Sequence, residues 1–168
     1  MRNTIVFALF IFVLTFSATA QTTSLKSDEI LLRVETESGK IFELKTADLA
    51  KLPRREVKGK THSGKESSFS GVDLREVLKL AGVKFGDEGK KINLISYLVV
   101  EAADKYKAIF AMIELESDFT DKIVLLADSS DGKPLSKDEG KLRLVVPDEK
   151  KQARWIRQVI ALKVQVVK

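Results

Sequence analysis

The sequence predicts a mixed α+β domain, and three observations lead to that fold class. Short apolar runs of strand-like composition recur along the chain, separated by turns rich in Gly, Asp and Ser. One segment, residues 72–81, has the apolar spacing of an amphipathic helix. The strands outnumber the helices and do not alternate regularly with them, which favours a mixed β-sheet domain with short helices over a parallel α/β fold.

The first twenty residues are expected to lie outside this domain. Arg2 precedes an apolar run that ends in the small-residue pattern Ala18-Thr19-Ala20, which is typical of a secretory signal peptide cleaved after Ala20. The alternative is an uncleaved membrane anchor, but the run is shorter than the roughly 20 residues that a span requires. We therefore expect a secreted or periplasmic protein without a membrane span after cleavage, a flexible lead-in at residues 21–29, and a single domain at residues 30–168.

The clearest helix is predicted at residues 72–81. Leu74, Val77, Leu78 and Ala81 share one face, and Gly82 can supply the left-handed residue that ends a helix. Ser70 is the expected N-cap of this helix. Shorter helices are expected at residues 47–52, capped by Thr46 and ended by Pro53, and at residues 111–116.

The strands are predicted from β-branched and aromatic composition and from alternation of apolar and polar residues. Residues 97–100 are apolar enough to be buried on both faces. In the last strand, Ile160, Leu162, Val164 and Val166 should face the core together. The expected strands are residues 30–36, 41–44, 54–61, 66–70, 92–101, 106–110, 123–127, 142–146 and 159–167.

The absence of cysteine narrows the possible functions. None of the 168 residues is a cysteine, which excludes a thiol nucleophile, a thiolate metal ligand and a lipid-anchored cysteine. The single histidine, His62, lies in a predicted turn and excludes a multi-histidine metal centre within one chain. The formal net charge of +5 comes from charges mixed along the chain, so a nucleic-acid partner is not expected.

Acidic residues gather around one predicted turn: Asp128, Asp131, Asp138 and Glu139. These carboxylates could hold Ca²⁺, but they lack the regular oxygen spacing of an EF-hand loop. A solvated turn is therefore the preferred interpretation. No serine-hydrolase, zinc-protease or P-loop motif is present.

Three arginines and a tryptophan are the strongest candidates for a binding site. Arg143 lies within an apolar strand, and Trp155 lies between Arg154 and Arg157. A buried arginine needs a carboxylate, a carbonyl or a bound anion. Two interpretations stay open: an anion-binding site, or an Arg143 paired with a local acid beside a Trp155 that seals the core.

Several ordered motifs resemble the sulfite-oxidase-type molybdopterin-binding domain. Residues 69–78, FSGVDLREVL, are similar to its aromatic-x-Gly-Val-x-Leu-x-x-Leu-Leu segment, and Asp104-Lys105-Tyr106 resembles its Asp-Gly-Tyr turn. Residues 125–127, 132–135, 140–147 and 154–157 resemble its later landmarks in the same order. The resemblance extends over roughly residues 30–167.

This resemblance implies a sulfite-oxidase-like fold and a pocket for a pterin cofactor, at Arg143, Arg154, Trp155 and Tyr106. In the enzymes of the family a cysteine thiolate ligates molybdenum, and this chain has none. Glu139 stands where the enzymes have the histidine of a His-Gly-x-Pro-x-Arg motif, and the proline after Gly140 is missing.

Three functions follow from the resemblance and from these departures. The first is a non-catalytic binding or accessory module with a protein partner or a small anionic ligand, in which molybdopterin is implied by resemblance only. The second is a molybdopterin-dependent oxidoreductase with a non-cysteine metal ligand. The third is a structural or partner-binding domain without a pocket.

Overall fold

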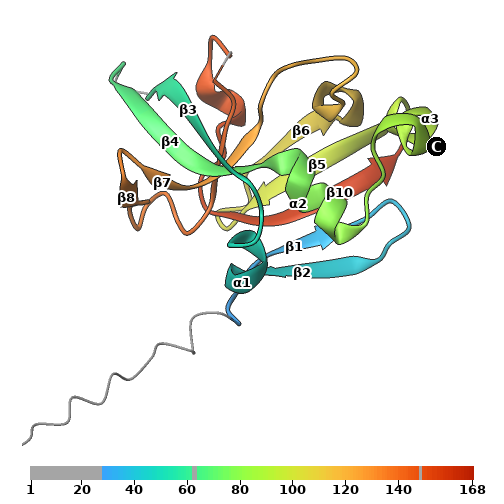
Figure 1. The fold of residues 1–168 in the computed structure, drawn as a ribbon, viewed down its shortest axis with the longest axis horizontal. Helices are drawn as coiled ribbons and strands as arrows, with labels where there is room; N and C mark the ends of the chain where they lie inside the picture. The colour runs from blue at the N-terminus through green and yellow to red at the C-terminus, as the bar shows by residue number, and fades with distance from the viewer. Residues whose placement is uncertain (1–27, 62–63, 148) are drawn as a thin grey trace, which may run out of the picture.

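Two β-sheets form the frame of the domain (Figure 1). The computed structural model describes residues 28–61, 64–147 and 149–168, so His62 and the predicted signal peptide lie outside the described residues. The first sheet has the order β2 (Ile41–Lys45), β1 (Ile30–Glu35), β10 (Val159–Val166), β5 (Ser96–Ala102) and β6 (Lys107–Ala111). The second sheet has the order β3 (Arg54–Lys60), β4 (Glu66–Asp73), β7 (Leu125–Ser130) and β8 (Lys133–Pro134), and β9 (Arg143–Val145) also pairs with β7.

Among the described strands, all pairs are antiparallel except β1 and β10, which are parallel. The strands β1 and β10, which are far apart in sequence, therefore lie side by side in the first sheet. The mixed β-sheet fold with short helices is confirmed. No helix in the described part of the chain is long and apolar enough to cross a membrane.

The central strand β5 shows how the core is divided between the faces of the first sheet. Leu98 and Val100 are fully buried, whereas Tyr97 and Val99 between them are half-buried. The prediction that both faces of residues 97–100 are buried is therefore wrong. This sheet covers the core with one face only, as is usual for antiparallel sheets.

The last strand β10 follows its predicted alternation only in part. Leu162 and Val164 are buried, but the side chain of Ile160 is 47% exposed. The pairing register with β5 shifts between Val159 and Ala161. Because a shift of one residue moves a side chain to the other face of the sheet, Ile160 faces outward, and its predicted place in the core is wrong.

The helix α2 (Leu74–Ala81) confirms the predicted amphipathic helix. Its four predicted core residues are buried, and Gly82 ends the helix with a φ of 102°. The predicted N-cap at Ser70 is wrong because β4 continues through Asp73. The carboxylate of Asp73 accepts a hydrogen bond from the backbone N–H of Arg75 at 2.9 Å, and thereby caps the helix.

The two other α-helices in the described residues are single turns. In α1 (Thr46–Leu49), Thr46 is the first helical residue and Lys45 occupies the cap position, which corrects the predicted cap. The turn α3 (Lys90–Asn93) lies where a strand was expected to begin, and β5 starts only at Ser96. Asn93 is buried and donates hydrogen bonds to Lys84 O and Glu116 Oε1, at 2.8 and 2.6 Å, which hold this turn in place.

Candidate functional site

Arg143 lies at the centre of the candidate site. It belongs to β9, faces Ala127 of β7 in the register, and is only 5% exposed. Its guanidinium carbon lies 5.0 Å from the ring centroid of Phe69 and 5.7 Å from that of Trp155. The two rings meet edge to face, with centroids 5.7 Å apart. Two aromatic faces therefore accommodate the cation where water is largely excluded.

Glu139 is the only carboxylate that pairs with Arg143 among the described residues. It forms an ion pair with Nη1 of Arg143 and also accepts hydrogen bonds from the backbone N–H and the hydroxyl of Ser136, at 3.2 and 2.9 Å. Nε of Arg143 is buried and has no hydrogen-bond partner within the described part of the chain. The guanidinium thus keeps unused hydrogen-bonding capacity despite its burial.

Gly140 fixes the loop that carries Glu139. It has a φ of 77°, and a Cβ at this position would lie 2.8 Å from Cα of Gln158. The backbone N–H of Gln158 donates to Glu139 O at 2.8 Å. A side chain at residue 140 would strain the backbone and collide with Gln158. The glycine therefore lets this loop pack closely enough for Glu139 to reach Arg143.

A cavity of about 380 Å³ opens beside Arg143. Trp155 and Gln152 form part of its wall, and Lys151 and Arg157 add two exposed cations. Neither of these two cations forms an ion pair with a residue that the structure describes; Asp148 lies outside those residues. The cavity thus brings three cationic side chains to one place, a charge distribution that suits an anion.

Trp155 combines the two roles that the sequence left as alternatives. Its side chain is buried, and its Nε1 donates to the carbonyl of Val146 at 2.8 Å. On its far side the indole ring contacts Gly59 of β3 so closely that a Cβ there would overlap it. It therefore seals the core between β3 and β9 and also lines the cavity.

Tyr106 lies at an adjoining cavity of about 230 Å³, which shares Trp155 and Arg157 with the first. Its hydroxyl donates to the carbonyl of Ala153 at 2.8 Å. The preceding residue, Lys105, has a φ of 73°, a left-handed conformation that costs least for glycine. This explains why a glycine suits the middle of an Asp-x-Tyr turn, and shows that the turn forms with lysine.

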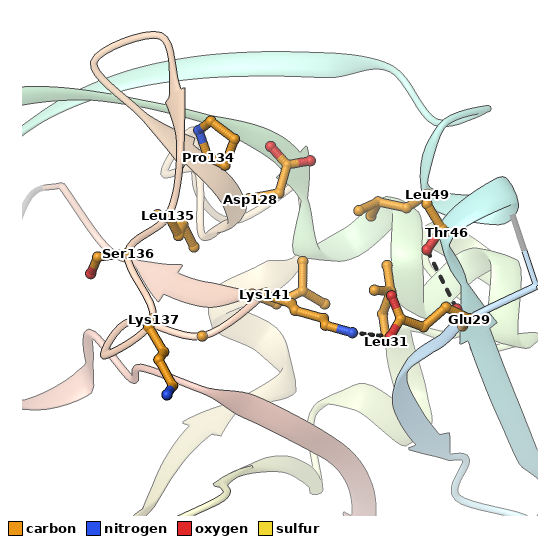
Figure 2. Close-up of a pocket in the computed structure, with 12 residues that line it drawn as sticks. Glu29, Leu31, Thr46, Leu49, Asp128, Pro134, Leu135, Ser136, Lys137 and Lys141 are labelled. Atoms are coloured by element: carbon orange, nitrogen blue, oxygen red, sulfur yellow. Dashed lines mark hydrogen bonds and ion pairs between the residues drawn. The ribbon is translucent and has the colours of Figure 1, made fainter. Parts of the chain in front are cut away.

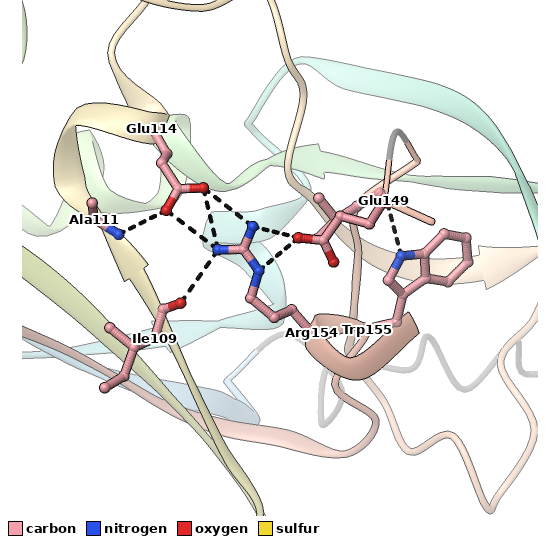
Figure 3. A network of polar contacts seen from close by, with 7 residues as sticks. Ile109, Ala111, Glu114, Glu149, Arg154 and Trp155 are labelled. Carbon is pink, nitrogen blue, oxygen red and sulfur yellow. Dashed lines mark hydrogen bonds and ion pairs between the residues drawn. The ribbon is translucent and has the colours of Figure 1, made fainter. Parts of the chain in front are cut away.

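Arg154 does not line either cavity. Figure 3 shows its guanidinium between two carboxylates: Glu149 accepts from Nε at 2.6 Å, and Glu114 accepts from Nη1 and Nη2 at 3.2 Å each. The carbonyl of Ile109 accepts a further bond from Nη1 at 3.3 Å. The guanidinium also lies 4.3 Å from the ring centroid of Phe110. The guanidinium of Arg154 thus lies outside the two cavities that Arg143, Trp155 and Tyr106 line.

Electrostatics also distinguishes the two arginines. Burial lowers the pKa of Arg143, and the ion pair with Glu139 opposes this only in part; the nearby charge of Arg157 adds to the lowering. Burial also disfavours the cation of Arg154, but its bonds to Glu114 and Glu149 outweigh this and raise its pKa. Arg143 is therefore the cation that would gain more from an additional anion.

The acidic cluster predicted around residues 128–139 is not one solvated turn. Asp128 pairs with Arg54, Asp131 accepts the backbone N–H of Ser68 at 2.9 Å, and Glu139 pairs with Arg143. The described residues contain no group of three or more acidic or histidine side chains that could hold a metal ion. Lys151 and Gln152 were missed as cavity-lining residues because a loop sequence does not show which side of the loop faces a cavity.

Comparisons with known proteins agree with this fold. The profile of the oxidoreductase molybdopterin binding domain family matches residues 19–166. The chain belongs to this family. It is also similar in structure to the sulfane dehydrogenase SoxCD from Paracoccus pantotrophus, with a TM-score of 0.60 and 23% sequence identity. That match covers 80% of this chain and 37% of the SoxCD chain, and it shows the fold alone. No curated protein matches the chain.

The residues present fit only part of a molybdopterin cofactor. Its anionic groups would meet Arg143, Lys151 and Arg157 at the cavity. Its metal would find no thiolate, because the chain has no cysteine, and Glu139 is already engaged by Arg143. The donor set therefore does not fit the metal centre, whereas the cationic set fits an oxyanion or a phosphate.

Proposed function

We propose that this member of the family is a non-catalytic binding or accessory module that holds a small oxyanion or phosphate-bearing ligand in the Arg143 cavity. The observation that supports this most strongly is the buried guanidinium of Arg143, whose Nε has no partner among the described residues. The exposed cations Lys151 and Arg157 face the same cavity. A phosphate oxygen at Arg143 would accept charge-assisted hydrogen bonds that Glu139 leaves unmade.

Glu139 limits the affinity of this site for an anion. Its carboxylate neutralises part of the charge of Arg143, so a bound anion has to compete with an internal one. Lys151 and Arg157 keep the net charge at the cavity positive, because neither pairs with a carboxylate in the described part of the chain. We therefore expect weak to moderate affinity that declines as the salt concentration rises.

Thermal unfolding in the presence of inorganic pyrophosphate tests the proposal. A ligand present at about 100 times its Kd stabilises the folded state by about 2.7 kcal/mol. We expect pyrophosphate to raise the Tm above that in sodium chloride of equal ionic strength. Arg157→Ala should reduce this shift strongly, and Arg143→Ala should abolish it. Lys91→Ala removes an exposed cation from α3 and should leave the shift unchanged.

Two results would contradict the proposal. No shift in the wild-type protein would favour a structural or partner-binding domain without a pocket. Stoichiometric molybdenum in protein purified from its native compartment would favour an oxidoreductase with a non-cysteine metal ligand. Because Arg157 is exposed, its variant should fold even if Arg143→Ala does not.

We further propose that residues 1–20 direct export and are removed after Ala20. The support is the sequence pattern alone: Arg2, the apolar run and the small-residue cleavage site. Mass spectrometry of the protein from its native host should show Gln21 as the first residue. An intact Met1 in the cytoplasm would contradict the proposal.

A further inference from the structure

A third cavity, of about 600 Å³, shares no lining residue with the Arg143 cavity. Leu31 of β1 and Leu49 of α1 line one side, and Pro134 of β8 and Leu135 line the other (Figure 2). Leu142 lines it as well. The volume is within the range of about 300–1,000 Å³ that is usual for small-molecule sites. Its lining is therefore suited to an apolar body of moderate size.

The carboxylates at this cavity are already neutralised. Both oxygens of Asp128 accept hydrogen bonds from Arg54, the Oδ1 contact being 2.7 Å. Glu29 forms an ion pair with Lys141, although the two residues are 112 positions apart in sequence. Figure 2 shows the side chain of Lys141 extending across the cavity to Glu29. Neither carboxylate is therefore free to attract a cationic ligand.

The cations at the same cavity are less fully engaged. Lys137 is exposed and forms no ion pair with any residue that the structure describes. Lys141 is 59% exposed, and exposed ion pairs such as Lys141–Glu29 contribute little to stability. Its ammonium group has three N–H donors, so it can bind a ligand carboxylate while it keeps its ion pair with Glu29. The charge left available at the rim of this apolar cavity is positive.

From this combination we infer that the cavity binds a small amphipathic monoanion, such as a medium-chain carboxylate. The apolar body lies against Leu31, Leu49 and Leu135, and the carboxylate lies at Lys137 and Lys141. This site is independent of the proposed anion site. The two are nevertheless connected by one loop, because Ser136 lines this cavity and also bonds Glu139, the partner of Arg143.

Fluorescence titration with 8-anilinonaphthalene-1-sulfonate, followed by displacement with decanoate, tests the inference. We expect one saturable dye site on the folded protein, from which decanoate displaces the dye and decylammonium does not. Lys137→Glu should weaken decanoate binding by about fivefold or more, since it replaces an attraction with a repulsion. Leu135→Glu should abolish binding because it introduces a charge into the apolar wall.

Lys133→Glu is the matched control. It makes the same charge change four residues away, at an exposed position of β8 that does not line the cavity. It should bind decanoate like the wild-type protein. Arg157→Ala should also leave decanoate binding intact, so failure of the phosphate site and failure of this site can be distinguished.

Three outcomes would overturn the inference. The first is that decanoate does not displace the dye, or that decylammonium displaces it equally well. The second is that Lys133→Glu weakens binding as much as Lys137→Glu does. The third is self-association of the wild-type protein that Leu135→Glu removes, which would assign the cavity to a second copy of the chain. Because Lys137 is exposed, its variant is expected to fold and the test remains decisive.

Discussion

Arg143 and Arg154 are two arginines of the same domain in opposite situations. Arg143 is almost fully buried, has one carboxylate partner, and keeps an unpaired Nε among the described residues. The side chain of Arg154 is 30% exposed and is held by two carboxylates and a carbonyl. The more buried cation is thus the less satisfied one, the reverse of what stability alone would favour.

Arg154 has a structural role at strand β6. Glu114, which it holds, also accepts the backbone N–H of Ala111 in β6 at 3.1 Å, and Arg154 itself bonds the carbonyl of Ile109 in the same strand. Strand β6 is at the edge of the first sheet. Unpaired groups on an edge strand invite pairing with other chains. Arg154 and Glu114 protect this edge, whereas Arg143 faces a cavity.

The largest expected difference in stability comes from removing one carboxylate partner of each arginine. Glu139→Ala leaves Arg143 buried without a carboxylate and should lower the free energy of unfolding by about 3 kcal/mol. Glu149→Ala leaves Arg154 with Glu114 and should cost only about 1 kcal/mol. Urea unfolding of both variants measures the difference. Equal losses would mean that the two arginines do not differ as the geometry indicates.

The same Glu139→Ala variant sharpens the assignment of function. Removing the internal carboxylate exposes the full charge of Arg143 to the cavity. We therefore expect pyrophosphate to stabilise Glu139→Ala more than it stabilises the wild-type protein, whereas Glu149→Ala should respond like wild type. Differential scanning fluorimetry at matched ionic strength measures both. An unchanged ligand response in Glu139→Ala would remove Arg143 from the proposed site.

The pH dependence of stability should also depend on Glu139. Burial raises the pKa of its carboxyl, but hydrogen bonds from Ser136 and the charge of Arg143 together lower it below the ordinary value. A lowered pKa contributes stability that is present above the unfolded-state value of about 4.3 and is lost as the pH falls through the folded-state value. Glu139→Gln lacks this contribution. Its deficit relative to wild type should therefore shrink below about pH 4.3, which urea unfolding from pH 7 to pH 3 can measure; parallel profiles would contradict this.

Much of the fold was predictable because it depends on local patterns. The apolar spacing of residues 74–81 identified α2, and the alternating strands identified most of both sheets. Errors occurred where tertiary contacts override local signals. The register shift between Val159 and Ala161 turned Ile160 outward, and the buried amide of Asn93 stabilised a helical turn in place of the start of β5.

The site was predictable in residue type but not in pairing. An arginine in an apolar strand indicated that Arg143 needs a partner, and the structure pairs it with the local acid Glu139. Arg154 gave the same signal, yet its partners Glu114 and Glu149 come from segments whose meeting depends on the whole fold. Cofactor binding at Arg143, Trp155 and Tyr106 stays a prediction. For Arg154, the geometry indicates a structural role, in which it bonds Glu114 and Glu149, and not cofactor binding.

The smallest effect expected from this comparison is that of Arg154→Lys. Lysine keeps the charge but has one nitrogen in place of the three that bond Glu149 and Glu114, so it cannot keep all of these hydrogen bonds. We expect a loss of about 0.5–1 kcal/mol in the free energy of unfolding, since the network is partly exposed. Pyrophosphate stabilisation should remain as in wild type, because Arg154 does not line the cavity. A variant that keeps its stability but loses the pyrophosphate response would reverse the assignment and make Arg154 the ligand-binding arginine.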